Sequence, residues 1–172
     1  SQRQEVIQNH YSKWWEDRPS TDRNRGYDRG AWKVNRDVNL FMSMIDDAQI
    51  TDNEKKSLRG EAYFIRAYIY FALVKRYGGV PIITDLANVD DVPSLFIPRS
   101  TEKETWDFVM ATCDSAVIFL DGYSGGVRRA SKWAALALKS RAALHAACVA
   151  KYWDQAPLSG EAVTQGSAKM EK

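Results

Sequence analysis

The stretch from Leu58 to Pro81 constrains the fold of this chain most, because it is an apolar helical run that ends abruptly at two glycines and a proline. At a period of about 3.6 residues its apolar side chains cover nearly the whole circumference, which is typical of a helix with neighbours on two or more sides. Thr51 and Glu54 stand at capping-box spacing and predict the start of the helix, and Gly78 suits the left-handed position after its end. Gly60 in the interior indicates that another backbone approaches closely. We therefore expect a central helix with other helices packed around it.

Three further segments carry helical spacing and set the fold class. Trp32–Ala48 precedes the central helix across a short link, so the two are expected to form an antiparallel hairpin. Thr101 and Glu104 repeat the capping-box spacing before a third helix that stops at Asp121, and Ser131 caps a fourth. The predicted fold class is therefore all-α, with tetratricopeptide-like helical hairpins joined by long irregular loops.

The same periodicity predicts which positions are buried. On Trp32–Ala48 the buried face is expected to be apolar and to be formed by Val34, Val38, Phe41, Met42 and Ile45. Arg66 lies on the otherwise apolar central helix, and a buried guanidinium needs carboxylates or carbonyls around it. We therefore expect Arg66 to form an ion pair with Asp46 or Asp85.

Composition and charge limit the classes of function. The net charge of +2 at pH 7 is small and no basic run dominates, so nothing indicates binding to nucleic acid. Charged side chains interrupt even the apolar run, so no membrane-spanning segment is expected, and the first residues do not have the pattern of a secretory signal. We expect one scaffold over residues 1–153, followed by a polar linker or the start of a further segment over residues 154–172.

Cysteines, histidines and catalytic motifs point away from metal, redox and enzymatic functions. Cys113 and Cys148 fall in different predicted helices, about 15 Å apart along an antiparallel pair, so we expect two buried thiols and no disulfide. His10 and His145 have no partner at the spacing of metal ligands. The sequence shows no Ser-His-Asp arrangement, phosphate-binding glycine loop or dinucleotide-binding fingerprint. We expect no cofactor, and a binding or interaction protein in place of an enzyme.

Several stretches of the sequence carry residue motifs that are more specific than helical periodicity alone. In the central region they are Gly60-Glu61-Ala62, Arg66-Ala67-Tyr68 and above all Tyr77-Gly78-Gly79-Val80-Pro81. Three more lie at residues 32–41, 98–101 and 130–141. In this order they resemble the SusD-like family, also called RagB/SusD, of nutrient-binding outer-membrane lipoproteins. The chain resembles the N-terminal, tetratricopeptide-like helical part of such a protein.

The resemblance implies a surface-exposed lipoprotein of the outer membrane that captures oligosaccharides, or in some relatives oligopeptides, for polysaccharide utilisation. Its implied partner is a TonB-dependent SusC-like transporter barrel, to which the ligand is delivered. Membrane contact is implied only through a lipid anchor, and this chain contains neither that anchor nor the C-terminal part that supplies much of the ligand site. The alternative is an intracellular tetratricopeptide-type adaptor that binds other proteins. A helical glycoside hydrolase, which needs two carboxylates in a cleft, is a third class.

Aromatic and polar side chains gather around residues 16–30, which we predict to be a surface loop from their Asp, Asn, Gly, Pro and Arg content. Aromatic rings stack on the C–H face of a pyranose while Arg, Asp and Asn bind its hydroxyls, because a sugar presents both kinds of surface. The candidate ligand-binding residues are Trp14, Trp15, Arg18, Asp22, Asn24, Arg25, Tyr27 and Trp32. Trp15 and Trp32 have a second interpretation, as anchors of the core.

Overall fold

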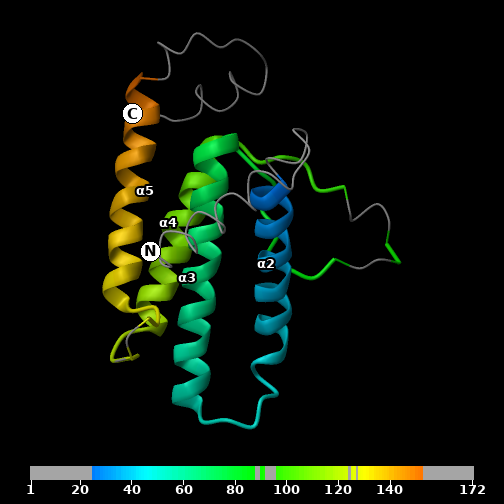
Figure 1. The fold of residues 1–172 in the computed structure, drawn as a ribbon, viewed down its shortest axis with the longest axis vertical. Coiled ribbons are helices and arrows are strands. Elements are labelled where there is room, and N and C mark those ends of the chain that lie inside the picture. Colours follow the sequence, from blue (N-terminus) through cyan, green and yellow to red (C-terminus); the bar gives the residue numbers. More distant parts are fainter. Residues whose placement is uncertain (1–24, 88–89, 92–95, 124, 127, 153–172) are drawn as a thin grey trace, which may run out of the picture. The chain divides into compact units, whose positions relative to one another are not determined.

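The computed structural model describes residues 25–87, 90–91, 96–123, 125–126 and 128–152 of the chain, with side chains from Gly30 onward. Four helices lie in this part: α2 (Arg25–Met44), α3 (Asp52–Tyr77), α4 (Glu102–Phe119) and α5 (Lys132–Tyr152) (Figure 1). These described residues contain no β-strand, and the prediction of an all-α fold is confirmed. The chain divides into two compact units, residues 1–34 and 35–172.

The second unit contains residues 35–44 of α2 and all of α3, α4 and α5, which follow one another in antiparallel directions as predicted from the sequence (Figure 1). The connection over residues 45–51 joins α2 to α3, and residues 120–131 join α4 to α5. α3 packs along α4, and α4 packs along α5, so that α4 has a helical neighbour on two sides. None of the described helices is both long enough and apolar enough to cross a membrane.

Capping boxes start α3 and α4 at the predicted residues. The Glu54 backbone N–H donates to Thr51 Oγ1 over 3.3 Å, and the Thr51 N–H donates to the Glu54 carboxylate over 2.9 Å. Thr101 and Glu104 form the same two bonds at the start of α4, at 3.2 and 2.7 Å. Ser131 Oγ accepts a backbone N–H of the first turn of α5 over 3.2 Å. These bonds satisfy N–H groups that a helix cannot pair internally, so local sequence fixes all three helix starts.

Aromatic rings from three helices meet in the core of the second unit. Trp106 of α4 is completely buried, and its ring meets Phe71 of α3 edge-on at 5.9 Å and stacks with His145 of α5 at 4.9 Å. Tyr70 of α3 meets Phe108 of α4 edge-on at 4.8 Å. Such pairs contribute about 0.5–1.5 kcal/mol beyond the burial of their area. His145 therefore joins α5 to the core through its ring.

Gly60 lies where α3 meets the end of α4, and the predicted close approach is confirmed. A Cβ on Gly60 would come within 2.6 Å of Leu120 Cγ and 3.1 Å of the Leu120 backbone nitrogen. Leu120 is itself completely buried, next to Ala116 and Ala135. The missing side chain at Gly60 therefore lets these two segments touch.

We expect Gly60→Ala to lower the free energy of unfolding by about 1–3 kcal/mol, because crowding at Leu120 outweighs the roughly 1 kcal/mol that alanine contributes in a helix interior. The double variant Gly60→Ala/Leu120→Ala should lose less than the sum of the two single variants, since the smaller side chain makes room for the new methyl group. Urea denaturation followed by circular dichroism measures all three variants. Strictly additive losses would contradict direct contact between the two positions.

The two glycines after α3 serve different purposes. Gly78 has φ 68° and ψ −138°, so the predicted need for a positive φ is confirmed, although its ψ lies outside the left-handed helical region. Gly79 is required for space, since a Cβ there would lie 1.9 Å from the Ser100 carbonyl oxygen. The Ser100 N–H donates to the Val80 carbonyl over 3.3 Å, and Arg99 donates to the carbonyls of Gly79 and of the last residue of α3. The segment that enters α4 is therefore bonded onto the turn that ends α3.

Exposure differs from the prediction on two helices. α3 is not covered all round, because Ile65 and Tyr68 are 43% and 56% exposed on a side that no described segment covers. Cys113 is buried as expected, but Cys148 is exposed, because at about 100° per residue it lies away from the buried side of α5 formed by Ala135, Leu138, Ala142 and Ala146. Both thiols are free, as predicted from their positions.

Candidate functional site

The predicted ligand-binding residues lie near the start of the chain, where the structure describes only part of the sequence. Those outside the described residues are Trp14, Trp15, Arg18, Asp22 and Asn24. Arg25 and Tyr27 lie in the first turn of α2, and Trp32 lies further along the same helix with a half-buried side chain. The prediction of a loop over residues 16–30 is therefore wrong for residues 25–30. The polar first turns of α2 show no apolar period, but a helix needs none to form its backbone hydrogen bonds.

A group of buried polar side chains joins α2, α3 and the segment that follows α3. Asn35 Nδ2 donates to the Ile83 carbonyl over 2.9 Å, and Asn39 Nδ2 donates to the same oxygen over 3.2 Å. The Ile83 N–H in turn donates to Tyr70 Oη over 2.8 Å. Arg66 Nη2 donates to Asn39 Oδ1 over 2.6 Å. We call Asn35, Asn39, Arg66 and Tyr70 the polar clamp, because together they hold both backbone groups of Ile83.

Arg66 is only 6% exposed, yet it does not form the ion pair that was predicted. Asp46 pairs with Arg59 instead, and no carboxylate of the described residues lies within ion-pair distance of Arg66. Burial lowers the pKa of the Arg66 guanidinium, and the negative charge of Asp85 opposes that shift. The guanidinium carbon lies 5.9 Å from the centre of the Tyr63 ring. An amide oxygen and the face of a ring therefore stabilise this charge where a carboxylate was expected.

The polar clamp has the chemistry of a structural element. Burial raises the pKa of Tyr70, so its hydroxyl stays neutral and able to hydrogen-bond at physiological pH. Among the described residues, Arg66 Nε and Asn35 Oδ1 are buried without a hydrogen-bond partner. The side-chain nitrogens of Asn35 and Asn39, together with Tyr70 Oη, are bonded to the backbone, and Arg66 Nη2 is bonded to Asn39 Oδ1. This arrangement fixes the chain after α3 against α2, and it offers no nucleophile or proton-transfer pair.

The sequence contained a signal for the clamp that the apolar pattern concealed. Val38 and Ile45 are buried as predicted, but Val34 is 42% exposed. Asn35 and Asn39 are buried in its place, at 2% and 4% exposure. Two asparagines four residues apart lie on the same face of a helix, and that face here coincides with the buried stripe. This spacing within an apolar stripe indicates a buried polar contact.

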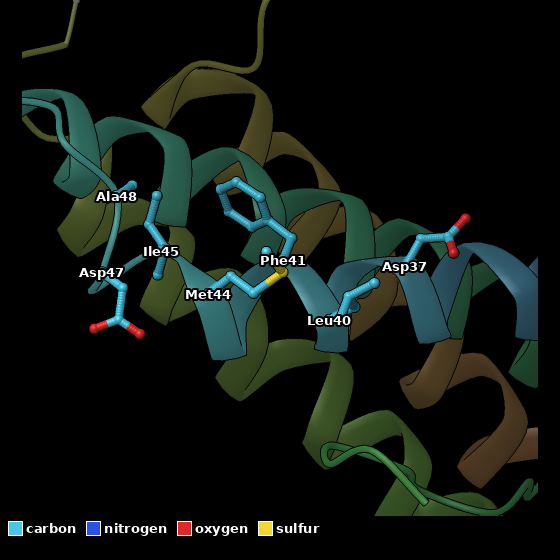
Figure 2. A pocket seen from close by; sticks show the side chains of 7 residues that line it. All are labelled: Asp37, Leu40, Phe41, Met44, Ile45, Asp47 and Ala48. Atoms are coloured by element: carbon cyan, nitrogen blue, oxygen red, sulfur yellow. The ribbon is translucent and has the colours of Figure 1, made fainter.

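An open apolar groove of about 580 Å³ lies along the C-terminal half of α2 and the turn after it (Figure 2). Its lining residues are Asp37, Leu40, Phe41, Met44, Ile45, Asp47 and Ala48. Figure 2 shows the two carboxylates toward opposite ends and the apolar side chains between them. Met44 is 60% exposed, whereas Ile45 is buried.

The chemistry of this groove suits apolar side chains better than a sugar. Its walls are aliphatic, thioether and phenyl groups, and its two charged groups stand at the ends. A pyranose needs hydrogen-bonding groups around a ring platform, whereas an apolar strip with polar margins is typical of protein contacts. No cluster of His, Cys, Asp and Glu side chains that could hold a metal ion occurs in the described part of the chain.

Sequence and structure both have matches among known proteins. Residues 2–144 match the SusD-like family described as starch-binding and associating with the outer membrane. A solved SusD-like protein from Bacteroides fragilis NCTC 9343 is 35% identical in sequence, with a TM-score of 0.65. That alignment covers 77% of this chain and 27% of the solved chain.

Two further solved structures share the fold at lower identity. A SusD-like carbohydrate binding protein from Bacteroides fragilis NCTC 9343 is 21% identical with a TM-score of 0.61, covering 75% of this chain and 26% of that one. A laminarin binding SusD-like protein is 20% identical with a TM-score of 0.62, covering 77% of this chain and 29% of that one. This chain thus spans little more than a quarter of the length of these structures. No curated protein matches it significantly.

Proposed function

The chain belongs to the SusD-like family, and from this premise we propose that it is the helical part of a cell-surface lipoprotein that binds oligosaccharides and delivers them to a TonB-dependent SusC-like transporter. The match over residues 2–144 carries the proposal, because that family is described as starch-binding and associating with the outer membrane. The lipid anchor, the transporter and the step of delivery are what the proposal adds. An intracellular adaptor would account for the helical hairpins but not for this match.

The stretches that carry the resemblance have structural roles in the described residues. Gly60 allows α3 to meet the end of α4, and Gly79 allows the entry to α4 to cross the turn after α3. Arg66 and Tyr70 hold the following segment through the polar clamp. These positions maintain the helical scaffold, and we therefore propose that side chains elsewhere determine which ligand is bound.

We place the oligosaccharide contacts at the aromatic, arginine, asparagine and aspartate side chains near the start of the chain. The proposed contacts are Trp14, Trp15, Arg18, Asp22, Asn24, Arg25, Tyr27 and Trp32. This combination supplies ring faces for the C–H surface of a sugar and donors and acceptors for its hydroxyls. No bond in the ligand is made or broken, so delivery depends on a difference in affinity between two states of the complex.

The test uses the complete gene product that contains this chain. A glycan screen that includes starch and laminarin fragments should show binding to at least one class of oligosaccharide, with the glycan recovered uncleaved. Purification from detergent-solubilised outer membranes should recover a transporter barrel together with the protein. Binding to no glycan would contradict the ligand class, and cleavage of the bound glycan would contradict a purely binding role. Recovery without a barrel would contradict the delivery step.

A further inference from the structure

Two polar atoms of the polar clamp indicate a small binding site inside the clamp itself. Arg66 Nε and Asn35 Oδ1 are buried, and no described residue forms a hydrogen bond with either atom. The two residues are only 6% and 2% exposed. A buried polar atom without a hydrogen bond costs stability, so most such atoms in folded proteins bond to another protein group or to ordered water. These two atoms therefore require a partner that the described residues do not supply.

The planar guanidinium group fixes where the partner of Arg66 lies. Nε and Nη2 stand on the same edge of this group, and their N–H donors point side by side. Arg66 Nη2 donates to Asn39 Oδ1 over 2.6 Å. The acceptor that Arg66 Nε requires therefore lies next to Asn39 Oδ1, within the clamp.

The second unpartnered atom belongs to the neighbouring side chain. Asn35 and Asn39 are four residues apart on α2, so their side chains are adjacent on one face of the helix. Both side-chain nitrogens donate to the same oxygen, the Ile83 carbonyl, over 2.9 and 3.2 Å. This shared acceptor fixes the orientation of both amides, because a reversed amide would place two oxygens against each other. Asn35 Oδ1 and Arg66 Nε are therefore parts of one small group of buried side chains.

From these observations we propose that the clamp binds one internal water molecule, which accepts from Arg66 Nε and donates to Asn35 Oδ1. The unpartnered atoms select this ligand because one is a donor and the other an acceptor. An anion can only accept, and the charge of the guanidinium repels a metal cation. Asn39 Oδ1 has a second lone pair for the other proton of the water. The water then makes about three hydrogen bonds, the usual number for a buried water.

This water completes the surroundings of a buried charge that has no carboxylate partner among the described residues. Arg66 then has three interactions: the amide oxygen of Asn39, the face of the Tyr63 ring and the water. The same water connects α2 to α3 without passing through the segment that follows α3, since Asn35 lies on α2 and Arg66 on α3. The loss of either unpartnered atom should therefore release it.

A crystal structure of the complete gene product, at a resolution that shows ordered water, tests the site directly. An isolated peak of electron density should lie about 2.7–3.2 Å from both Arg66 Nε and Asn35 Oδ1. A direct hydrogen bond between these two atoms would overturn the proposal. A hydroxyl side chain from another part of the polypeptide at this position, or a bound anion there, would also overturn it.

Magnetic relaxation dispersion of water counts the long-lived internal waters of the same protein in solution. Asn35→Leu replaces the acceptor with an apolar side chain of similar size, so this variant should hold about one such water fewer than the wild type. Gly60→Ala is the matched control, because it is expected to lower stability without altering the clamp, and it should keep the wild-type number. Equal numbers in Asn35→Leu and the wild type would overturn the proposal.

If Asn35→Leu does not fold, the crystal structure of the wild type decides alone. The oligosaccharide-binding proposal does not depend on these outcomes, since none of its residues belongs to the clamp.

Discussion

Gly79→Ala is expected to destabilise the protein by about 3 kcal/mol or more, because the new methyl group has no space and meets only backbone. A Cβ at this position would lie 1.9 Å from the Ser100 carbonyl oxygen, 2.6 Å from the Thr101 carbonyl carbon and 2.8 Å from the Glu102 nitrogen. Backbone cannot rotate away as a flexible side chain can. Relief therefore requires the start of α4 to move and to lose the hydrogen bond between Ser100 and Val80.

Gly126→Ala is the matched control for this variant, because a Cβ there meets nothing within 4 Å and its φ is not positive. Its free energy of unfolding should stay within about 0.5 kcal/mol of the wild type. Chemical denaturation followed by tryptophan fluorescence reports on both variants, since Trp106 lies in the core beside the affected turn. Equal stability of the two alanine variants would contradict the close crossing described for Gly79.

Asn39→Leu should destabilise by about 3–5 kcal/mol, because it leaves a buried charge without its hydrogen-bond acceptor. Asn39 Oδ1 accepts from Arg66, and Asn39 Nδ2 donates to the carbonyls of Ile83 and Asp85 at 3.2 and 3.0 Å. Leucine is of similar size, so the loss reports on hydrogen bonding more than on packing. Asn53→Ala, on the exposed first turn of α3, is the control and should change stability little.

The double variant Asn39→Leu/Arg66→Met separates the buried charge from the other roles of Asn39. Removing the guanidinium together with its acceptor should recover a substantial part of the stability that Asn39→Leu loses, since an apolar pair can replace a buried polar one at little cost. Denaturant titration of the four proteins in this cycle gives the coupling energy. A double variant no more stable than Asn39→Leu would show that the bonds to Ile83 and Asp85, and not the charge, explain the loss.

The elements that the sequence predicts well are those with a local physical cause. Both capping boxes form at the expected threonines, Thr51 and Thr101, because their partners lie within one turn of the same helix. Gly60 was predictable as a point of close contact, because a glycine lowers helix stability unless a neighbouring segment occupies the space of its missing side chain. The close approach of Leu120 to Gly60 is that contact. The residues that end α3 were predictable for the same reason.

The features that periodicity missed depend on contacts distant in sequence. The polar clamp joins Asn35 and Asn39 to a segment more than forty residues later in the chain. The residues next to the two asparagines in sequence do not indicate which segment they bind. Arg66 has a hydrogen-bond partner, as its burial requires, but the partner is the side-chain amide of Asn39 and not a carboxylate. Cys148 was predicted to be buried because an alanine-rich helix gives no sign of which side its neighbours occupy.

The sequence predicts the candidate ligand site less completely than it predicts the scaffold. Its chemistry was inferred from residue types, and five of its eight members lie outside the described residues. Of the other three, Trp32 has a described side chain, and it is half-buried on α2, which suits an anchoring role as well as a ligand contact. The scaffold identifies the family through packing requirements, and such requirements carry no information about which sugar is bound.

Titration calorimetry of the complete gene product with the strongest glycan from the screen measures what the proposed oligosaccharide contacts contribute to binding. The triple variant Trp14→Ala/Arg25→Ala/Tyr27→Ala should bind at least about 100-fold more weakly than the wild type, because two ring platforms and a charged donor are removed. Phe96→Ala removes an aromatic side chain that is 81% exposed elsewhere on the chain, and it should bind as the wild type does. Affinity unchanged in the triple variant would contradict the proposed contacts, and a wild-type protein that binds no glycan would contradict the oligosaccharide-binding function itself.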